Sequence, residues 1–215
     1  MAFAYPISLE VGGRRAVVIG RDAVVQGKAD SLIEAGARVT IIAEGPQGPL
    51  ARLKQEAAAT VLRRRYRRGD LEGAFVCVAS SQDSAERDAI AREARSLGVL
   101  VNVMDDIPNC DFAAPAVVRR GDLVISISTG ARSPALARRL RVELSRRFGP
   151  EWKDFVELLG EVRTETLADL PEIGERSRRW QQALDVDALL ALIKDGRRDE
   201  ARSLLLSRLV GAGAA

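Results

Sequence analysis

The stretch RRAVVIGRDAVVQGKADSLIEAGARVTIIAE, residues 14–44, decides the fold. It begins with a short apolar, β-branched run that ends at Gly20, which is typical of a buried strand. Apolar residues then recur at helical spacing until Gly36, where the predicted helix ends. ARVTIIA follows as a second buried strand. The stretch therefore predicts a strand–helix–strand unit, whose first turn is the usual place for a dinucleotide site.

The same alternation continues along the first half of the chain. PLARLKQEAAA and SAERDAIAREARSLG are typical of helices, and TVLRRRY, GAFVCVAS and VLVNVMD are typical of strands. Strands that alternate with helices of this length form a parallel sheet with right-handed crossovers. We therefore predict an α/β, Rossmann-like domain over residues 1–112.

The pattern changes after residue 112. FAAPAVVRRGDLVISIS indicates two strands joined by a turn at Gly121 and Asp122, and a helix is predicted to start after Ser133 with Pro134 in its first position. From Glu151 onward the sequence is helical in pattern. These changes divide the second half into residues 113–148 and a small helical domain over residues 149–215.

Composition excludes several classes of protein. The net charge is only +3 and aromatic residues make up 4%, which argues against a nucleic-acid partner. No apolar run reaches the roughly 20 residues of a membrane span, and the first residues lack a secretory signal, so we expect no membrane partner. The two cysteines form no paired framework, which favours the cytoplasm. Because there is no histidine, proton transfer must use other groups.

Four segments resemble those of a known family in their residues and in their spacing. They are YPISLEVGGRRAVVIG, GDLEGAFVCVAS, GVLVNVMDD and CDFAAPAVVRRGDLVISISTGARSPALARRLRVEL. With them the chain resembles the precorrin-2 dehydrogenase / sirohydrochlorin ferrochelatase family, a module that also occurs fused in siroheme synthase. The resemblance implies a homodimer with an NAD-binding Rossmann domain, a dimerisation region over residues 113–148 and a C-terminal helical domain. It also implies oxidation of precorrin-2 to sirohydrochlorin with NAD⁺, and in some members insertion of Fe²⁺ as co-substrate.

The glycine loop departs from the family's pattern. Gly20 supplies the first fingerprint glycine, but the second position is Asp22 and the third is Val25. Asp22 places a negative charge where a pyrophosphate would lie at a helix N-terminus, and Arg21 could offset it. The loop is therefore compatible with a weakened or re-routed NAD site and equally with an abandoned one. By position, the family's cofactor contacts fall on Gly20, Arg21, Asp22, Ala23, Val24, Glu44, Ser81 and Asn102.

Glu44 follows the second strand, where an acid commonly accepts hydrogen bonds from ribose hydroxyls. The alternative is a solvated loop residue.

The resemblance assigns a catalytic role to Asp105 in NVMDD, which follows a strand at the carboxyl edge of the predicted sheet. A carboxylate there could accept the proton that leaves the macrocycle during oxidation, and it could hold Fe²⁺ transiently. The alternative is that Asp105 and Asp106 only cap a turn before Pro108.

The loop STGARS and the arginines around it suggest an anion site for the carboxylates of a tetrapyrrole. The predicted substrate contacts are Thr129, Gly130, Arg132, Ser133 and Arg120. The alternative is a solvated helix face with salt bridges across a dimer. RRRYRR, residues 63–68, is interpreted as a solvated edge.

Three hypotheses remain open from the sequence. The first is NAD-dependent oxidation of precorrin-2, with or without iron insertion. The second is an enzyme specialised for Fe²⁺ insertion. The third is a tetrapyrrole-binding protein that performs no chemistry.

Overall fold

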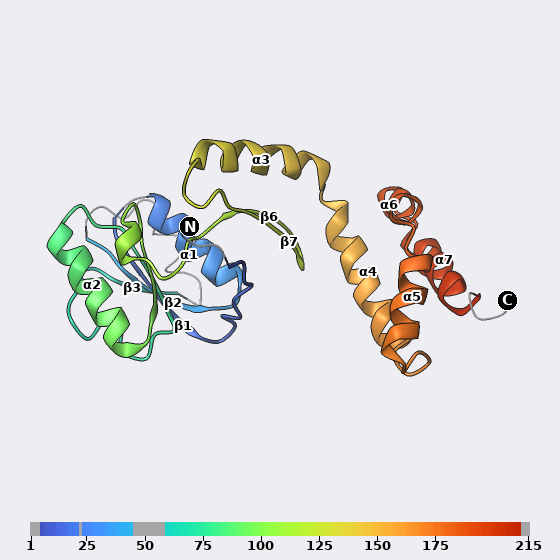
Figure 1. Ribbon diagram of the computed structural model, residues 1–215, viewed down its shortest axis with the longest axis horizontal. Coiled ribbons are helices and arrows are strands. Elements are labelled where there is room, and N and C mark those ends of the chain that lie inside the picture. Colours follow the sequence, from blue (N-terminus) through green and yellow to red (C-terminus); the bar gives the residue numbers. More distant parts are fainter. Residues whose placement is uncertain (1–4, 22, 45–58, 212–215) are drawn as a thin grey trace. The chain divides into compact units, whose positions relative to one another are not determined.

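The structure is a computed structural model that describes residues 5–21, 23–44 and 59–211 (Figure 1). The chain forms two compact units, Met1–Ala114 and Pro115–Ala215. The helix expected over residues 49–59 lies almost entirely outside the described residues. The division into three parts stays a prediction.

The first unit is a Rossmann-like parallel sheet, as predicted. Its strands have the order β3-β2-β1-β4-β5 and every neighbouring pair is parallel. The strands are β1 Arg15–Ile19, β2 Arg38–Ile42, β3 Ala59–Leu62, β4 Val76–Ala79 and β5 Leu100–Val103. Two α-helices accompany them among the described residues, α1 Ala23–Glu34 and α2 Ser84–Leu97.

Both faces of the central strands are buried, which explains why the strands are apolar without alternation. In β1, Val18 packs in the cluster that contains Ala29 of α1. Its neighbour Val17 packs in the opposite cluster, with Ile90 of α2. Side chains of successive residues point to opposite faces of a strand, so an all-apolar strand supplies both cores.

The boundaries of α2 follow from its end residues. The side chain of Asp83 accepts a hydrogen bond from the Ala85 amide at 2.9 Å, which satisfies a free donor of the first turn. Gly98 ends the helix with φ of +68°, a conformation that glycine adopts without steric cost. The chain then enters β5, and a short 3₁₀ helix, Ile107–Asn109, follows that strand.

The second unit begins with an antiparallel pair and continues as helices. β6 Ala116–Arg120 pairs with β7 Leu123–Ile127 around the predicted turn. The helices are α3 Pro134–Arg147, α4 Glu151–Glu165, α5 Ile173–Ala183, α6 Val186–Lys194 and α7 Arg198–Gly211. The last four enclose a core of their own, centred on Phe155, Leu158 and Leu205. None of the described helices has the length and apolarity needed to cross a membrane.

Candidate functional site

A pocket of about 230 Å³ lies at the carboxyl ends of the parallel strands. In a doubly wound sheet this edge is where ligands bind, beside the point at which the strand order reverses. Here the order reverses between β1 and β4. The lining residues are Ile19, Gly20, Arg21, Ile42, Glu44, Arg64, Arg65, Tyr66, Ser80, Ser81, Gln82, Asp83 and Glu86.

The predicted cofactor residues divide into three groups. Gly20, Arg21, Glu44 and Ser81 line the pocket. Asp22 lies outside the described residues, and of Ala23 and Val24 the structure describes only the main chain, in the first turn of α1. Asn102 is not among the lining residues.

Gly20 marks a close approach between the first strand and the first helix. Its φ is +147°, and a Cβ built there would lie 2.5 Å from Cγ2 of Val25 and 2.9 Å from the Ser80 carbonyl oxygen. Val25 itself is buried in the core. The valine at the third fingerprint position is therefore accommodated because Gly20 leaves room for it.

Glu44 accepts from two arginines. Its Oε2 lies 2.6 Å from Nη2 of Arg21 and 3.2 Å from Nε of Arg65. Glu44 is therefore more than the solvated loop residue that the sequence left open. It holds together the ends of β1, β2 and β3, since Arg21 follows the first of these strands and Arg65 follows the third.

Acidic residues also line the pocket at the start of α2. The Ser81 hydroxyl donates to Oε2 of Glu86 at 2.5 Å and accepts from the Asp83 amide at 3.2 Å. Asp83 in turn caps α2. The lining therefore contains the Glu44 carboxylate with the arginines that contact it, and two further carboxylates, Asp83 and Glu86, at the start of α2.

The interpretation of residues 63–68 as a solvated edge is wrong for two of them. Arg64 donates to both carboxylate oxygens of Asp70, at 2.7 and 2.6 Å. The Tyr66 hydroxyl donates to the buried carboxylate of Glu93, and burial together with that carboxylate raises the pKa of Tyr66. The sequence could have indicated a role for this segment, because residues 63–68 follow a strand and so lie at the carboxyl edge of the sheet, where ligands bind.

At the end of β5, Asn102 anchors the chain that leaves the sheet. Its Nδ2 donates to the Phe112 carbonyl at 2.7 Å. Nearby, the Asp111 carboxylate accepts from the Val101 amide at 3.0 Å. Both contacts fasten residues 111–112 back onto the strand.

Asp105 is exposed at the carboxyl end of β5, in a turn with unusual backbone geometry. Its φ is +60°, and Asp105 and Ala131 are the two non-glycine residues with positive φ within the described part of the chain. Asp and Asn adopt this conformation more readily than other non-glycine residues, but it is still unfavourable in free energy. Residues with such strained backbone geometry occur preferentially at functional sites.

Asp106 fixes the turn that carries Asp105. Its carboxylate accepts from Asn109 at 3.1 Å and from Nε of Arg87 at 3.0 Å. These donors hold the pKa of Asp106 below its ordinary value. Arg87 also donates to the Ser81 carbonyl at 3.0 Å, so it joins the turn to the pocket wall. The sequence analysis did not single out Arg87.

In the second unit the predicted anion loop is held by its own hydroxyls. The Thr129 Oγ1 accepts from the Ser133 amide at 3.1 Å, and the Ser133 Oγ accepts from the Leu136 amide at 3.3 Å. The Gly130 amide donates to Ser128 at 3.2 Å. Arg132 is exposed. The hydroxyls of Thr129 and Ser133 thus order the entry of α3.

Arg120 forms hydrogen bonds with the main chain of this unit. It donates to the main-chain carbonyls of Phe148 at 2.8 Å, Ser145 at 3.0 Å and Arg119 at 2.8 Å. Two of these carbonyls lie at the end of α3, where carbonyls lack partners within the helix. Its guanidinium therefore contacts the main chain of the second unit, and its role as a substrate contact stays a prediction.

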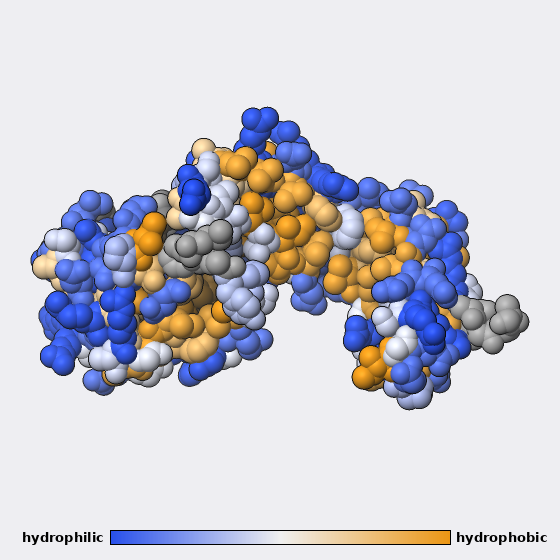
Figure 2. All heavy atoms as spheres, viewed as in Figure 1, coloured by the Kyte–Doolittle hydropathy of each residue, from blue (hydrophilic) through white to orange (hydrophobic). Residues whose placement is uncertain are grey.

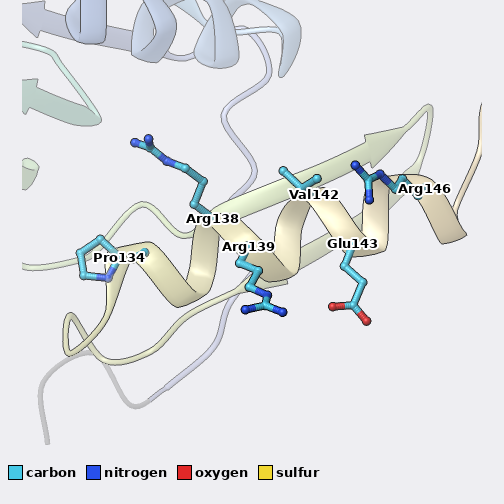
Figure 3. Close-up of a pocket in the computed structure, with 7 residues that line it drawn as sticks. Pro134, Arg138, Arg139, Val142, Glu143 and Arg146 are labelled. Atoms are coloured by element: carbon cyan, nitrogen blue, oxygen red, sulfur yellow. The ribbon is translucent and has the colours of Figure 1, made fainter.

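A second, open hollow of about 790 Å³ follows one side of α3. Its lining residues are Pro134, Ala135, Arg138, Arg139, Val142, Glu143 and Arg146 (Figure 3). All of them belong to a single helix, and Figure 3 shows Arg138 and Arg139 pointing in different directions. The hollow is thus an uncovered helix surface without convergent polar groups.

Comparisons with known proteins agree with the geometry of the first unit. The family model described as "Putative NAD(P)-binding" matches residues 7–116. A siroheme synthase of Stutzerimonas stutzeri is 30% identical over 209 residues, which are 96% of this chain and 44% of the relative. Siroheme synthase 1 of Pectobacterium atrosepticum is 32% identical over 205 residues, 95% of this chain and 42% of the relative. The chain thus spans less than half the length of these relatives.

Among solved structures, a chain described as SirC, precorrin-2 dehydrogenase, has the same fold. The TM-score is 0.69 at 22% identity, with 95% of this chain and 98% of that chain covered.

Proposed function

Because this chain belongs to the NAD(P)-binding family and is a relative of the precorrin-2 dehydrogenases, we propose that it oxidises precorrin-2 to sirohydrochlorin with a nicotinamide dinucleotide. The observation that carries the proposal is the pocket at the carboxyl edge of the sheet, which four of the predicted cofactor residues line.

The residues around the pocket fit a dinucleotide. The missing side chain at Gly20 lets the chain turn tightly where a pyrophosphate would approach. Glu44 lies at the end of β2, where ribose hydroxyls would donate to it. Arg21 beside it supplies a positive charge for a phosphate. When bound, the nicotinamide would accept the hydride.

Asp105 is proposed as the proton acceptor. The oxidation removes a hydride and a proton from the macrocycle, and the exposed carboxylate at the end of β5 can accept the proton. Asp106, Asn109 and Arg87 would act as positioning residues because they hold the turn in place.

The substrate contacts and the dimer stay proposals about the second unit. Arg132 is free to reach a substrate carboxylate because its side chain is exposed, whereas we propose a positioning role for Thr129, Ser133 and Arg120. A homodimer is supported by large apolar side chains left exposed on β6, β7 and α3, where Figure 2 shows hydrophobic surface. They are Val117, Val124, Leu136 and Val142.

Iron insertion is a separate proposal. Within the described residues, no group of three or more Asp, Glu or Cys side chains is placed to hold a metal ion. Fe²⁺ as a substrate would therefore rely on Asp105 together with the nitrogens of the macrocycle. Sirohydrochlorin incubated with Fe²⁺ should give siroheme at a rate that depends on Asp105 if this proposal holds.

Two measurements test the dehydrogenase. The first is calorimetric titration of the full chain with oxidised and reduced dinucleotide, since absence of binding at millimolar concentration would leave only ferrochelatase or ligand carriage. The second is anaerobic turnover of precorrin-2, followed by the absorbance of sirohydrochlorin. Asp105→Asn keeps a side chain that tolerates positive φ, and we expect it to abolish turnover while the dinucleotide still binds. Asp169→Asn, which removes an exposed carboxylate of the second unit, should be fully active; equal activity of the two variants would reject Asp105.

A further inference from the structure

The turn after β5 holds its central residue in an unfavourable conformation. Asp105 has a φ of +60° and lies between β5 and the 3₁₀ helix Ile107–Asn109. A residue with a side chain keeps such a conformation only where the surrounding structure fixes it from several sides. The contacts of residues 106–110 therefore bear on how Asp105 is held in place.

Local hydrogen bonds give the turn its shape. The Asp106 amide donates to the Val103 carbonyl at 3.2 Å, and the Asn109 amide donates to the Asp106 carbonyl at 3.0 Å. The Cys110 thiol donates to the same two carbonyls, at 3.0 Å to Val103 and at 3.3 Å to Asp106. All of these partners lie within residues 103–110, so they fix the turn only to the end of its own strand.

Two neighbouring side chains of α2 contact the turn from outside it. Arg87 donates from Nε to the Asp106 carboxylate at 3.0 Å. Asp88 accepts at Oδ1 from Nδ2 of Asn109 at 2.9 Å, and the same nitrogen donates to Asp106 at 3.1 Å. Asp106 and Asn109 thus bind each other within the turn, and each also binds a side chain of the helix.

Arg95 supplies a third contact from the last turn of α2. Its Nη2 donates to the Pro108 carbonyl oxygen at 2.8 Å. Arg87, Asp88 and Arg95 occupy positions i, i+1 and i+8, which at 3.6 residues per turn fall within about 100° of the helix circumference. One side of α2 therefore carries all three contacts.

The helix that carries these contacts is itself well fixed. Ile90, Ala91 and Ala94 are completely buried in the core of the first unit. Both ends of α2 are capped, by the side chain of Asp83 and by Gly98. A group held by a packed helix is placed more accurately than one held by a loop alone.

We propose that Asp88 and Arg95 are positioning residues for the proposed reaction, and that together with Arg87 they hold Asp105 in its unfavourable conformation by fastening the turn to α2. The inference rests on the proposed function, in which Asp105 accepts the proton. Asp88 and Arg95 are not among the residues that line the dinucleotide pocket. Because a small displacement of a reacting group lowers the rate of the chemical step, their loss should lower kcat rather than cofactor affinity.

Arg95→Ala removes the contact with Pro108, and Arg92→Ala is its matched control. Arg92 is exposed on the same helix, and its side chain has no hydrogen bond or ion pair with another described residue. In anaerobic turnover of precorrin-2, Arg95→Ala should lower kcat about fivefold, as for the loss of one hydrogen bond, with KM for the dinucleotide unchanged. Arg92→Ala should match the parent. Arg95→Lys, which keeps a charged donor, should recover part of kcat.

Amide hydrogen exchange, followed by NMR on the full chain, reports on the turn without any turnover. The amides of Asn109 and Cys110 should exchange about fivefold faster in Arg95→Ala and in Asp88→Ala, because the turn opens locally. The amides of β4 should exchange as in the parent. Asp88→Asn keeps an acceptor for Asn109 and should also exchange as in the parent.

The outcomes separate this inference from the proposed function. Unchanged exchange in both Arg95→Ala and Asp88→Ala would show that α2 does not hold the turn. Faster exchange with unchanged kcat would overturn the positioning role and leave a purely structural contact. If the parent itself does not turn over precorrin-2, the proposed function fails and the positioning role with it, whereas the exchange rates still decide whether α2 holds the turn.

Discussion

Replacing Gly20 by alanine tests whether the close approach of β1 and α1 is needed in this chain. The added Cβ would meet Cγ2 of Val25 at 2.5 Å and the Ser80 carbonyl oxygen at 2.9 Å. Overpacking of a core typically costs about 1–3 kcal/mol, and a side chain at unfavourable positive φ adds about 1–3 kcal/mol. We therefore expect Gly20→Ala to lower the free energy of unfolding of the first unit by about 3 kcal/mol.

Val25→Ala in the same chain should relieve only part of this loss. It removes the contact with Cγ2, but the contact with a main-chain oxygen and the φ of +147° remain. The double variant should therefore be more stable than the sum of the two single losses predicts, by about 1 kcal/mol, yet less stable than Val25→Ala alone.

Urea denaturation is a suitable assay because tryptophan fluorescence reports on the second unit alone, whereas circular dichroism reports on both units. Both tryptophans, Trp152 and Trp180, lie in the second unit, so their fluorescence should not change with Gly20. Far-UV circular dichroism follows both units and should show an earlier transition. Gly27→Ala is the matched control, since a Cβ at this helical glycine meets nothing within 4 Å, and it should stabilise by about 0.5–1 kcal/mol. If Gly20→Ala unfolds at the same urea concentration as the parent, the argument from close approach is refuted.

Three further predictions concern the loops. Ala131→Gly should stabilise the second unit by about 0.5–1 kcal/mol in thermal denaturation, because φ is +62° there, and a loss of stability would contradict this. Glu93→Ala should cost about 3 kcal/mol in urea, since it removes the acceptor of three hydrogen bonds; a cost under about 1 kcal/mol would reject it. Because the pKa of Asp106 is lowered in the folded state, its carboxylate stabilises the fold above the unfolded-state pKa, and this stabilisation is lost as the pH falls through the folded-state pKa. The loss of stability caused by Asp106→Asn should therefore shrink below pH 3.8, the ordinary pKa of this group. A loss of stability that stays constant with pH would contradict this linkage.

The fold could be predicted from the sequence because each of its signals is local. The apolar run before Gly20, Gly98 at the end of α2 and Pro134 in the first turn of α3 each act within a few residues of the chain. Gly20, Arg21, Glu44 and Ser81 could also be placed, since the carboxyl ends of neighbouring parallel strands meet at one edge.

The contacts that modify the site are long-range and could not be read from the sequence. Arg65 meets Glu44, 21 residues away, and Tyr66 meets Glu93, 27 residues away. Arg120 reaches the carbonyl of Phe148, 28 residues away. In each case a charged or polar side chain has several partners within its length, and tertiary packing selects one.

Arg87 connects two loops of the first unit through its hydrogen bonds. One of its nitrogens holds the Ser81 carbonyl at the pocket and another holds Asp106 beside the proposed proton acceptor. A ligand that displaced residue 81 would be expected to shift the turn at residue 105 through Arg87, and the coupling free energy between the two positions would be the same in both directions. If the proposed function holds, the dinucleotide and the tetrapyrrole would not bind independently. The affinity for dinucleotide, measured with and without tetrapyrrole, would then differ by the same factor as the affinity for tetrapyrrole measured with and without dinucleotide.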